Sequence, residues 1–349
     1  MEDKIIKELK TKLITFGPSP PPFGGTTISH EITLDFLKSK NIDFINISTN
    51  NKSIINQFTC FLSLINKYRD FNIYILFAGS SLRTIYFGNF ILMFKKLYSF
   101  KLGVRFFGAD LIELYNKNIF HKFFILRLLK HSNVCYLQTK KVFNYFDKFK
   151  SICWLPTSRK IVNTPTKPSS YPIKSFFYLG LISNEKGIKK LLKILEKCYN
   201  INPNFEFNLA GQNTIGDEIN DYPFVNYHGI ISNTNDKISF IDSNDTLLFP
   251  SEWKSEGYSG TVIEAISRKK LVIVNNHNYL PEMLNVNGSN LGIIFDLNVE
   301  NNLRDIILNL LNNEIELNTF QKAIELNYNY YCSERWNKFM IDRLLQTSY

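Results

Sequence analysis

The feature that most constrains the fold is an alternation of short apolar runs with longer segments of helical periodicity. The apolar runs of the first half are residues 12–17, 43–48, 72–77 and 102–108, and the helices expected between them are 26–39, 53–68 and 82–97. Strands that alternate with helices predict a parallel sheet with helices on both faces, and ligands bind such sheets at the carboxyl ends of the strands. The pattern returns after residue 175 and predicts a second sheet of the same α/β kind.

A polar segment separates the two sets of strands and helices. Residues 157–172, TSRKIVNTPTKPSSYP, contain three prolines and show neither a helical nor a strand period. This composition is typical of an inter-domain linker, and 349 residues suffice for two domains with separate cores. We therefore expect a first α/β domain at 1–160, a linker at 161–174, a second α/β domain at 175–332 and a terminal helix at 333–349.

The charge of the chain is uneven. Residues 1–170 contain 25 Lys and Arg against 10 Asp and Glu, a net charge of +15, whereas the remainder carries −5. This asymmetry favours an anionic partner of the first half, such as a membrane surface or a lipid-linked phosphate, over nucleic acid, because no nucleic-acid motif occurs. Residues 117–131 form a basic amphipathic segment. Two interpretations of it stay open: contact with an anionic membrane, or packing of its apolar face on the sheet.

The sequence favours a cytoplasmic location, with association at the cytoplasmic face of the membrane as an option. The first ten residues, MEDKIIKELK, lack the apolar core of a signal peptide. The most apolar window, 71–94, is broken by glycine, serine and arginine and does not predict a membrane span. Five scattered cysteines without C-x-x-C spacing indicate a reducing compartment, and no residue pattern predicts a metal site.

Residues 249–274, FPSEWKSEGYSGTVIEAISRKKLVIV, point to function. They predict a strand end, a loop of small residues, a helix start and another strand. The N-terminus of that helix offers N–H groups and a positive dipole end to an anion such as a phosphate, and the carboxylate of Glu264 could hold neutral hydroxyls. A phosphate beside sugar hydroxyls suggests a nucleotide-sugar. Lys186, at another strand-to-helix turn, is suited to meet a phosphate as a point charge.

These motifs carry a resemblance to a known family. Glu256 and Glu264 form a Glu-x7-Glu pair after Pro250-Ser251, Lys186 is followed by Gly187, and a Gly24-Gly25 loop follows the first strand. In this order and spacing they resemble the retaining GT-B glycosyltransferases of the group 1 type, glycosyltransferase family 4. The resemblance implies two Rossmann-like domains facing a central cleft, with a C-terminal helix that crosses back to the first domain. It also implies transfer of a sugar from a nucleoside diphosphate to a hydroxyl without a metal cofactor.

The resemblance also implies roles for individual residues. Lys186, the Gly24-Gly25 backbone and the N–H groups of Ser259, Gly260 and Thr261 would stabilise the leaving diphosphate. Glu264 would bind the ribose, and Glu256 would bind hydroxyls of the transferred sugar. The remaining substrate contacts that it implies are Arg105, Gly180, Gly211 and Gly229.

Two assignments stay open at this point. Asp110, in an R-x-x-G-x-D segment, is either the N-cap of the helix that follows or a carboxylate beside the acceptor hydroxyl. The Gly24-Gly25 segment is either a donor-facing loop or a simple connection.

The main departure of this sequence from the family pattern is Leu181, which stands where the family has an arginine. The leading hypothesis is a glycosyltransferase acting on a glycan or lipid-linked acceptor in surface polysaccharide or glycoconjugate synthesis. One alternative, which Leu181 suggests, is a catalytically impaired protein that binds sugar-nucleotides or anionic glycans. Another is a sugar-nucleotide epimerase of the same fold.

Overall fold

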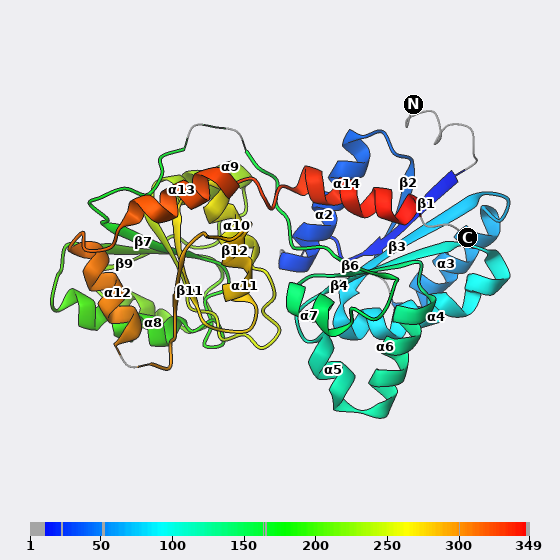
Figure 1. Cartoon of the computed structure of the whole chain (residues 1–349), viewed down its shortest axis with the longest axis horizontal. Helices are drawn as coiled ribbons and strands as arrows, with labels where there is room; N and C mark the ends of the chain where they lie inside the picture. Colours follow the sequence, from blue (N-terminus) through cyan, green and yellow to red (C-terminus); the bar gives the residue numbers. More distant parts are fainter. Residues whose placement is uncertain are drawn as a thin grey trace. The chain divides into compact units, whose positions relative to one another are not determined.

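The structure is a computed structural model of the chain. It describes residues 11–21, 24–50, 53–162, 164, 166–299 and 301–346. The chain divides into two compact units (Figure 1). The first unit comprises Met1–Lys160 and Cys332–Tyr349, and the second comprises Ile161–Tyr331.

The first unit is built on a six-stranded parallel sheet of order β2-β1-β3-β4-β5-β6. Its strands are β1 Thr11–Gly17, β2 Phe44–Ser48, β3 Asn72–Ser80, β4 Lys101–Phe107, β5 Val134–Leu137 and β6 Ile152–Trp154. All seven residues of β4 are buried, because helices cover both faces of the sheet. Such two-sided burial explains why these strands appear in the sequence as continuous apolar runs.

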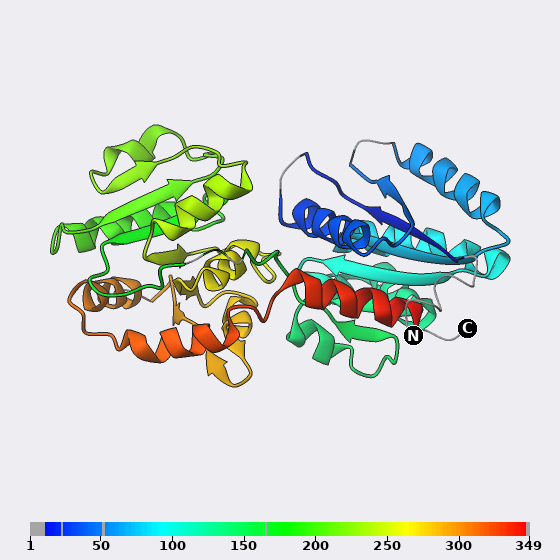
Figure 2. The ribbon, with the colours of Figure 1, turned by 90° about the horizontal axis from the view of Figure 1, so that it is seen from above.

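Helices cover the two faces of this sheet unequally. They are α2 Gly25–Ser39, α3 Ile54–Lys67, α4 Ser81–Tyr98, α5 Leu111–Lys117, α6 Ile119–His131, α7 Lys140–Tyr145 and α14 Ser333–Leu345. Helices α2 and α14 pack together on one face, whereas α4 and α6 pack together on the other (Figures 1 and 2). Right-handed crossovers produce this division, because β1 passes to β2 in the direction opposite to the later connections.

Helix α14 comes from the end of the chain and belongs to the first unit, as the GT-B resemblance implies. The Tyr136 hydroxyl on β5 donates a 2.5 Å hydrogen bond to the Met340 carbonyl. Thr33 on α2 donates a 3.0 Å bond to Asn337. Both bonds are buried, so α14 is a fixed part of the first unit's packing.

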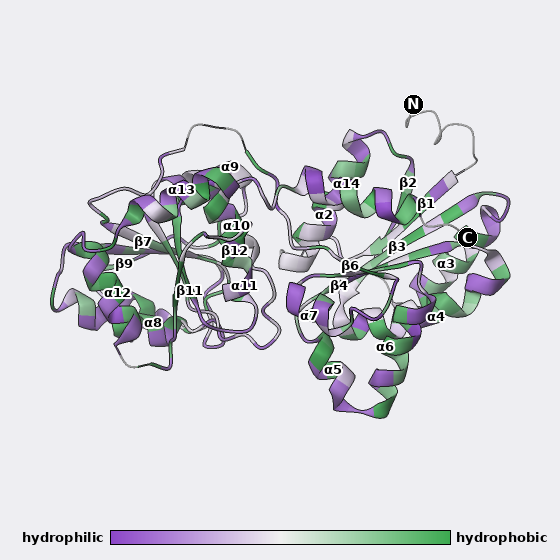
Figure 3. Ribbon diagram, in the orientation of Figure 1, coloured by the Kyte–Doolittle hydropathy of each residue, from purple (hydrophilic) through white to green (hydrophobic). Residues whose placement is uncertain are grey.

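The second unit repeats the architecture with a parallel sheet of order β14-β11-β10-β7-β8-β9. Its strands are β7 Ser175–Leu179, β8 Glu206–Ala210, β9 Val225–Tyr227, β10 Thr246–Phe249, β11 Leu271–Asn275 and β14 Ile293–Phe295, with a small hairpin of β12 Asn285–Val286 and β13 Ser289–Asn290. Its helices are α8 Ile188–Tyr199, α9 Thr234–Asp242, α10 Gly260–Ser267, α11 Leu280–Leu284, α12 Asn302–Leu311 and α13 Leu317–Asn327, and η1 Asp217–Asp221 is a 3-10 turn. Figure 3 shows hydrophilic residues gathered on the helices and loops around both sheets.

The polar segment expected as a linker is anchored to the second unit in its described part. Ser169 Oγ accepts a 2.7 Å bond from the Leu271 N–H at the start of β11. The Lys270 ammonium donates a 2.9 Å bond to the Lys167 carbonyl, and Arg268 donates a 2.9 Å bond to the Val162 carbonyl. Hydrogen bonds of this kind explain how a stretch without a helical or strand period takes a defined path.

The carboxyl ends of β7, β8 and β9 meet through glycines. The Gly211 N–H donates a 2.7 Å bond to the Gly229 carbonyl, and the Gly180 N–H donates a 2.9 Å bond to the Ala210 carbonyl. Gly211 has φ +136°, and a Cβ at this position would lie 1.8 Å from the Gly180 carbonyl oxygen. Only glycine fits this position, and it fixes the edge of the sheet where α/β proteins bind ligands.

A Gly211→Ala substitution tests this constraint. We expect it to lower the free energy of unfolding by at least about 3 kcal/mol, because it adds a backbone clash to a strained φ. Gly288→Ala is the control: its φ is +78° and its Cβ would meet nothing within 4 Å, so a loss of only about 1–2 kcal/mol is expected. Urea unfolding of both variants provides the measurement. Equal losses would show that the contact with Gly180 does not constrain the fold.

Candidate functional site

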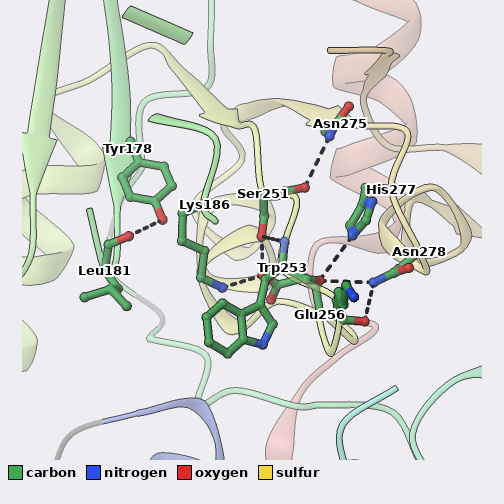
Figure 4. Close-up of polar contacts among 10 residues, drawn as sticks. Tyr178, Leu181, Lys186, Ser251, Trp253, Glu256, Asn275, His277 and Asn278 are labelled. Carbon is green, nitrogen blue, oxygen red and sulfur yellow. Dashed lines mark hydrogen bonds and ion pairs between the residues drawn. The ribbon is translucent and has the colours of Figure 1, made fainter. Parts of the chain in front are cut away.

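The loop after β10 is a network of hydrogen bonds at the carboxyl edge of the second sheet (Figure 4). The Ser251 carbonyl accepts a 3.2 Å bond from the Asn275 side chain at the end of β11. The Trp253 carbonyl accepts bonds from Asn278 Nδ2 at 3.1 Å and from the His277 ring at 3.2 Å. These bonds tie residues 251–253 to the neighbouring strand and its following loop, and thereby fix a segment that has no secondary structure of its own.

Lys186 and Glu256 meet in this loop as an ion pair of 2.5 Å. The same Glu256 oxygen accepts a 2.5 Å bond from Ser251 Oγ. The Lys186 and Glu256 side chains are only 17% and 12% exposed, and the lysine ammonium lies 5.4 Å from the centre of the Trp253 ring. The pair is therefore partly desolvated, and its charges interact more strongly than they would on an open surface.

Gly187 explains how Lys186 reaches this position. It is the N-cap of α8 with φ +72°, and a Cβ there would lie 2.2 Å from the Pro250 carbonyl oxygen. The turn after β7 and the loop after β10 thus touch backbone to backbone at Gly187 and Pro250. Because β7 and β10 are neighbours in the sheet, this contact brings Lys186 next to the Ser251–Glu256 segment.

Tyr178 and Leu181 lie at the end of β7 beside this ion pair (Figure 4). The buried Tyr178 hydroxyl donates a 2.9 Å bond to the Leu181 carbonyl. Burial, and next the charge of Glu256, raise the pKa of Tyr178 well above its ordinary value, so it acts as a neutral donor. The Leu181 side chain is 38% exposed and adds no charge to the site.

Glu264 lies one turn inside α10 and pairs with a lysine that sequence reasoning missed. Lys237 Nζ on α9 donates a 2.9 Å bond to Glu264 Oε1. Both helices begin at the carboxyl edge of the sheet, because α9 follows β9 and α10 follows the loop after β10. Ser259 is the N-cap of α10, Gly260 and Thr261 form its first turn, and the Ser259 side chain makes no capping bond within the described chain.

In the first unit, the Gly24-Gly25 pair forms the start of α2. Gly24 is the N-cap, and its N–H donates a 2.9 Å bond to Thr27 Oγ1. Within the described chain, a Cβ on Gly24 would touch only Thr27, at 3.9 Å, and one on Gly25 would meet nothing within 4 Å. The described residues therefore do not confine either glycine. The structure does not describe residues 22 and 23 of this loop.

Asp110 occupies the N-cap position of α5 without capping it through its side chain. Its backbone carbonyl accepts the first helical bond from Leu114, whereas its carboxylate accepts a 2.5 Å bond from Ser81 Oγ at the start of α4. Asp110 is thus held at the carboxyl edge of the first sheet, where β3 and β4 end.

Arg105 lies within β4 and is buried beneath α2. Its guanidinium donates a 3.3 Å bond to Thr33 and stacks 4.8 Å from the centre of the Phe107 ring. Burial, followed by the charge of Arg159, lowers its pKa to about 10. Its described contacts are with protein groups of the first unit.

The structure brings together two of the residues singled out for catalysis, Lys186 and Glu256, and holds Asp110 separately in the first unit. It adds Ser251, Trp253 and Lys237, which the sequence analysis did not select. Ser251 could have been found, because it belongs to the Pro-Ser pair before the Glu-x7-Glu motif. Lys237 could not, because nothing in its sequence neighbourhood marks it. Among the described residues, no cluster of His, Cys, Asp and Glu is arranged to hold a metal ion.

Comparison with solved structures identifies the fold as that of GT-B glycosyltransferases. HepE of Anabaena in complex with UDP matches with a TM-score of 0.71 at 12% identity, over 96% of this chain and 99% of that one. The lipopolysaccharide outer core galactosyltransferase WaaB matches with 0.67 at 12% identity, over 97% and 100%. S. aureus TarM, in complex with UDP, matches with 0.61 at 19% identity, over 82% of this chain, which spans 57% of the length of TarM.

Sequence comparison adds a family match within the second unit. Residues 165–326 match the family model described as "Glycosyl transferases group 1". The match includes Lys186, Glu256 and Glu264. A search of curated proteins found no match. The expected α/β fold of two Rossmann-like parallel-sheet units is thus confirmed.

His30 on α2 predicts a pH dependence of stability. It is buried against Gly17 and bonded to Asn46, and burial is the main cause that lowers its pKa from 6.5 to about 4. Because the folded chain binds this proton less readily than the unfolded chain does, stability should fall as pH decreases from about 6.5 to about 4. The loss attributable to His30 is about 3 kcal/mol.

Urea unfolding of wild type and His30→Gln at pH 7.5 and pH 4.5 measures this dependence. Other groups titrate in both proteins, so the difference between the two losses isolates His30. We expect the variant to lose less stability than wild type over this interval. Parallel losses would contradict the role assigned to His30.

Proposed function

We propose that the chain is a glycosyltransferase that moves a sugar from a nucleoside-diphosphate-sugar to a hydroxyl. The observation that carries the proposal is the Lys186–Glu256–Ser251 cluster at the carboxyl edge of the second sheet, in the loop that leads to the start of α10. A cation, a helix N-terminus and carboxylates on neighbouring connections are suited to a diphosphate flanked by hydroxyl groups. The group 1 match over these residues supports the same activity.

Each side chain of the cluster has a role in this proposal. Lys186 leaves Glu256 and binds the diphosphate, together with the N–H groups of Ser259, Gly260 and Thr261. Glu264 accepts bonds from the ribose hydroxyls. Glu256, released from the lysine, accepts bonds from hydroxyls of the sugar that is transferred. These interactions strengthen as negative charge develops on the leaving diphosphate, which is the condition for catalysis rather than simple binding.

The proposed transfer retains the anomeric configuration and needs no metal. The bond between the anomeric carbon and the diphosphate oxygen breaks, and a bond to the acceptor oxygen forms on the same face. The acceptor proton passes to an oxygen of the leaving diphosphate. Lys186 and the first turn of α10 provide the positive charge that a metal ion provides in other transferases.

UDP-sugars are the first donors to examine, and the acceptor is proposed to be a glycan or a lipid-linked glycan. HepE and TarM were solved with UDP, and WaaB is a galactosyltransferase of the lipopolysaccharide outer core. Asp110, held at the carboxyl edge of the first sheet, is the candidate to orient the acceptor hydroxyl. A role in surface polysaccharide or glycoconjugate synthesis follows from these acceptors.

One observation favours a second candidate function. The exposed Leu181 leaves Lys186 as the cation of the β7–α8 turn, where the resemblance implies an additional arginine. A protein with a weakened leaving-group site would bind sugar-nucleotides without transferring the sugar. The two functions differ in release of the nucleoside diphosphate, which only the transferase catalyses when an acceptor is present.

A thermal-shift screen of UDP-, GDP- and dTDP-sugars tests donor binding, because a ligand that binds only the folded chain raises its melting temperature. We expect one nucleotide class to stabilise wild type. Glu264→Ala should reduce its affinity about tenfold or more and abolish nucleoside diphosphate release, because it removes charged hydrogen bonds to the ribose. Glu252→Gln is the control, because Glu252 lies in the loop that leads to α10 and pairs with the exposed Lys190 at 2.7 Å.

Each outcome of this screen has a defined meaning. Full activity of Glu264→Ala, or no stabilisation by any sugar-nucleotide, would contradict the transferase. Binding without nucleoside diphosphate release would select the impaired binding protein. Conversion of the donor to another sugar-nucleotide without an acceptor would select the epimerase. Activity that survives EDTA would support the metal-independent reaction, and its loss would contradict it.

We also propose that the first unit contacts an anionic membrane through the turn between α5 and α6. Helix α6 packs on α4 through a buried face that includes Ile125 and Leu128. Its opposite side exposes Ile119, Phe120 and Phe123, which are 77%, 71% and 59% exposed. The exposed phenylalanines lie close in sequence to Lys117 and Lys122, and such a combination is suited to the interface of an anionic bilayer. No helix of the described chain is both long and apolar enough to cross a membrane.

Flotation with liposomes containing anionic lipid tests this contact. We expect wild type to float at low salt and to bind less at high salt. A Phe120→Ser/Phe123→Ser variant should lose most of the binding, because it removes the apolar surface that would enter the interface. Leu326→Ser is the control, since Leu326 is 78% exposed in the second unit. Equal flotation of all three proteins would contradict this surface.

A further inference from the structure

Helices α9 and α10 of the second unit are joined by two ion pairs. Lys237 and Glu264 are 2.9 Å apart near the carboxyl edge of the sheet, where both helices begin. Asp242 and Arg268 are 2.5 Å apart where both helices end. The two pairs link the same helices at opposite ends, so each serves as a reference for the other.

The arginine of the pair at the far end is integrated into the protein interior, whereas the Asp242 side chain is 27% exposed. The Arg268 side chain is 3% exposed and also donates a 2.9 Å bond to the Val162 carbonyl. The Lys270 ammonium donates a 2.9 Å bond to the Asp242 carbonyl. These contacts connect α9 and α10 to the preceding polar segment and to the sheet. The Asp242–Arg268 pair therefore acts as a structural clamp between the two helices.

In the pair near the carboxyl edge, neither side chain is fully buried. The Lys237 and Glu264 side chains are 23% and 16% exposed, and within the described chain the Lys237 ammonium has Glu264 as its one hydrogen-bond partner. The pair thus reaches solvent at the edge of the sheet where the proposed donor binds. A clamp does not need this location, because the far-end pair, through the buried Arg268, already joins the two helices.

We propose that Lys237 is a positioning residue that holds the Glu264 carboxylate for the ribose of the donor. This inference rests on the proposed function. By binding Oε1, the lysine fixes a side chain that has several rotamers, and a carboxylate, with about four acceptor positions, can accept from the ribose hydroxyls as well as from the lysine. It also offsets the negative charge of Glu264, which would otherwise repel a neighbouring diphosphate.

The 2′-hydroxyl of the ribose provides a specific readout. A charged hydrogen bond to it should make wild type bind the ribonucleoside diphosphate about tenfold or more tightly than its 2′-deoxy analogue. If Lys237 positions Glu264, Lys237→Met should reduce this preference to about threefold or less, as Glu264→Gln should. Lys237→Arg, which keeps the charge and the donor, should retain it. Isothermal titration calorimetry with UDP and dUDP, or with the pair that the donor screen selects, measures these ratios.

Asp242→Asn is the matched control. It weakens the ion pair at the far end of the same helices, so it should lower the melting temperature and leave the ribose preference unchanged. If Lys237 had only a structural role, Lys237→Met would likewise lower the melting temperature and leave the ribose preference unchanged. If Lys237→Met does not fold, Lys237→Gln replaces it, because the neutral amide keeps a polar group at this partly exposed position.

The possible results separate this inference from the proposed function. Wild type that binds no nucleoside diphosphate would overturn both. Wild type that binds UDP and dUDP equally, or a Lys237→Met variant that keeps the full preference, would overturn only the role of Lys237. A preference that falls in Lys237→Met and Glu264→Gln, and persists in Lys237→Arg and Asp242→Asn, would support it.

Discussion

The site of the second unit depends on the backbone contact between Gly187 and Pro250. Glycine is required there, because any Cβ would lie 2.2 Å from the Pro250 carbonyl oxygen. This contact joins the turn after β7 to the loop after β10, and the Lys186–Glu256 pair forms beside it. The charged groups of the site are therefore placed by the sheet itself, and the hydrogen bonds from Asn275 and Asn278 hold the intervening loop against the next strand.

Most of the fold could be predicted from the sequence, because burial on both faces turns parallel strands into continuous apolar runs. The limits of the helices were less certain. The sequence predicts an amphipathic segment at 117–131 and a helix at 82–97, whereas α6 starts at Ile119 and α4 covers Ser81–Tyr98. Asn118 explains the first difference: it adopts an extended conformation and caps α6 through a bond from the His121 N–H. This cap is local to the sequence, but the period of the apolar residues does not mark it.

Within the site, motif residues could be predicted and their partners could not. Lys186, Glu256 and Glu264 stand in recognisable local patterns, but the pairing of Glu264 with Lys237 joins positions 27 residues apart on different helices. The substrate contact that the resemblance implies for Arg105 stays a prediction. The structure adds that the Arg105 guanidinium lies beneath α2, where it contacts Thr33 and Phe107. The contact with Thr33 could not be predicted either, because Thr33 belongs to α2.

Helix α14 has a consequence for biosynthesis. The first unit contains its own sheet within the first 160 residues, and α4 and α6 cover one face of β4 and β5, but the covering of their other face comes from residues 333–345. Domains generally fold in the order in which the ribosome produces them. Here the apolar surface beneath α14 stays uncovered until the whole second unit has been made. All elements of the second unit are therefore synthesised before the first unit is complete, although the second unit comes later in the sequence. The first unit can complete its packing only when residues 333–345 have been added.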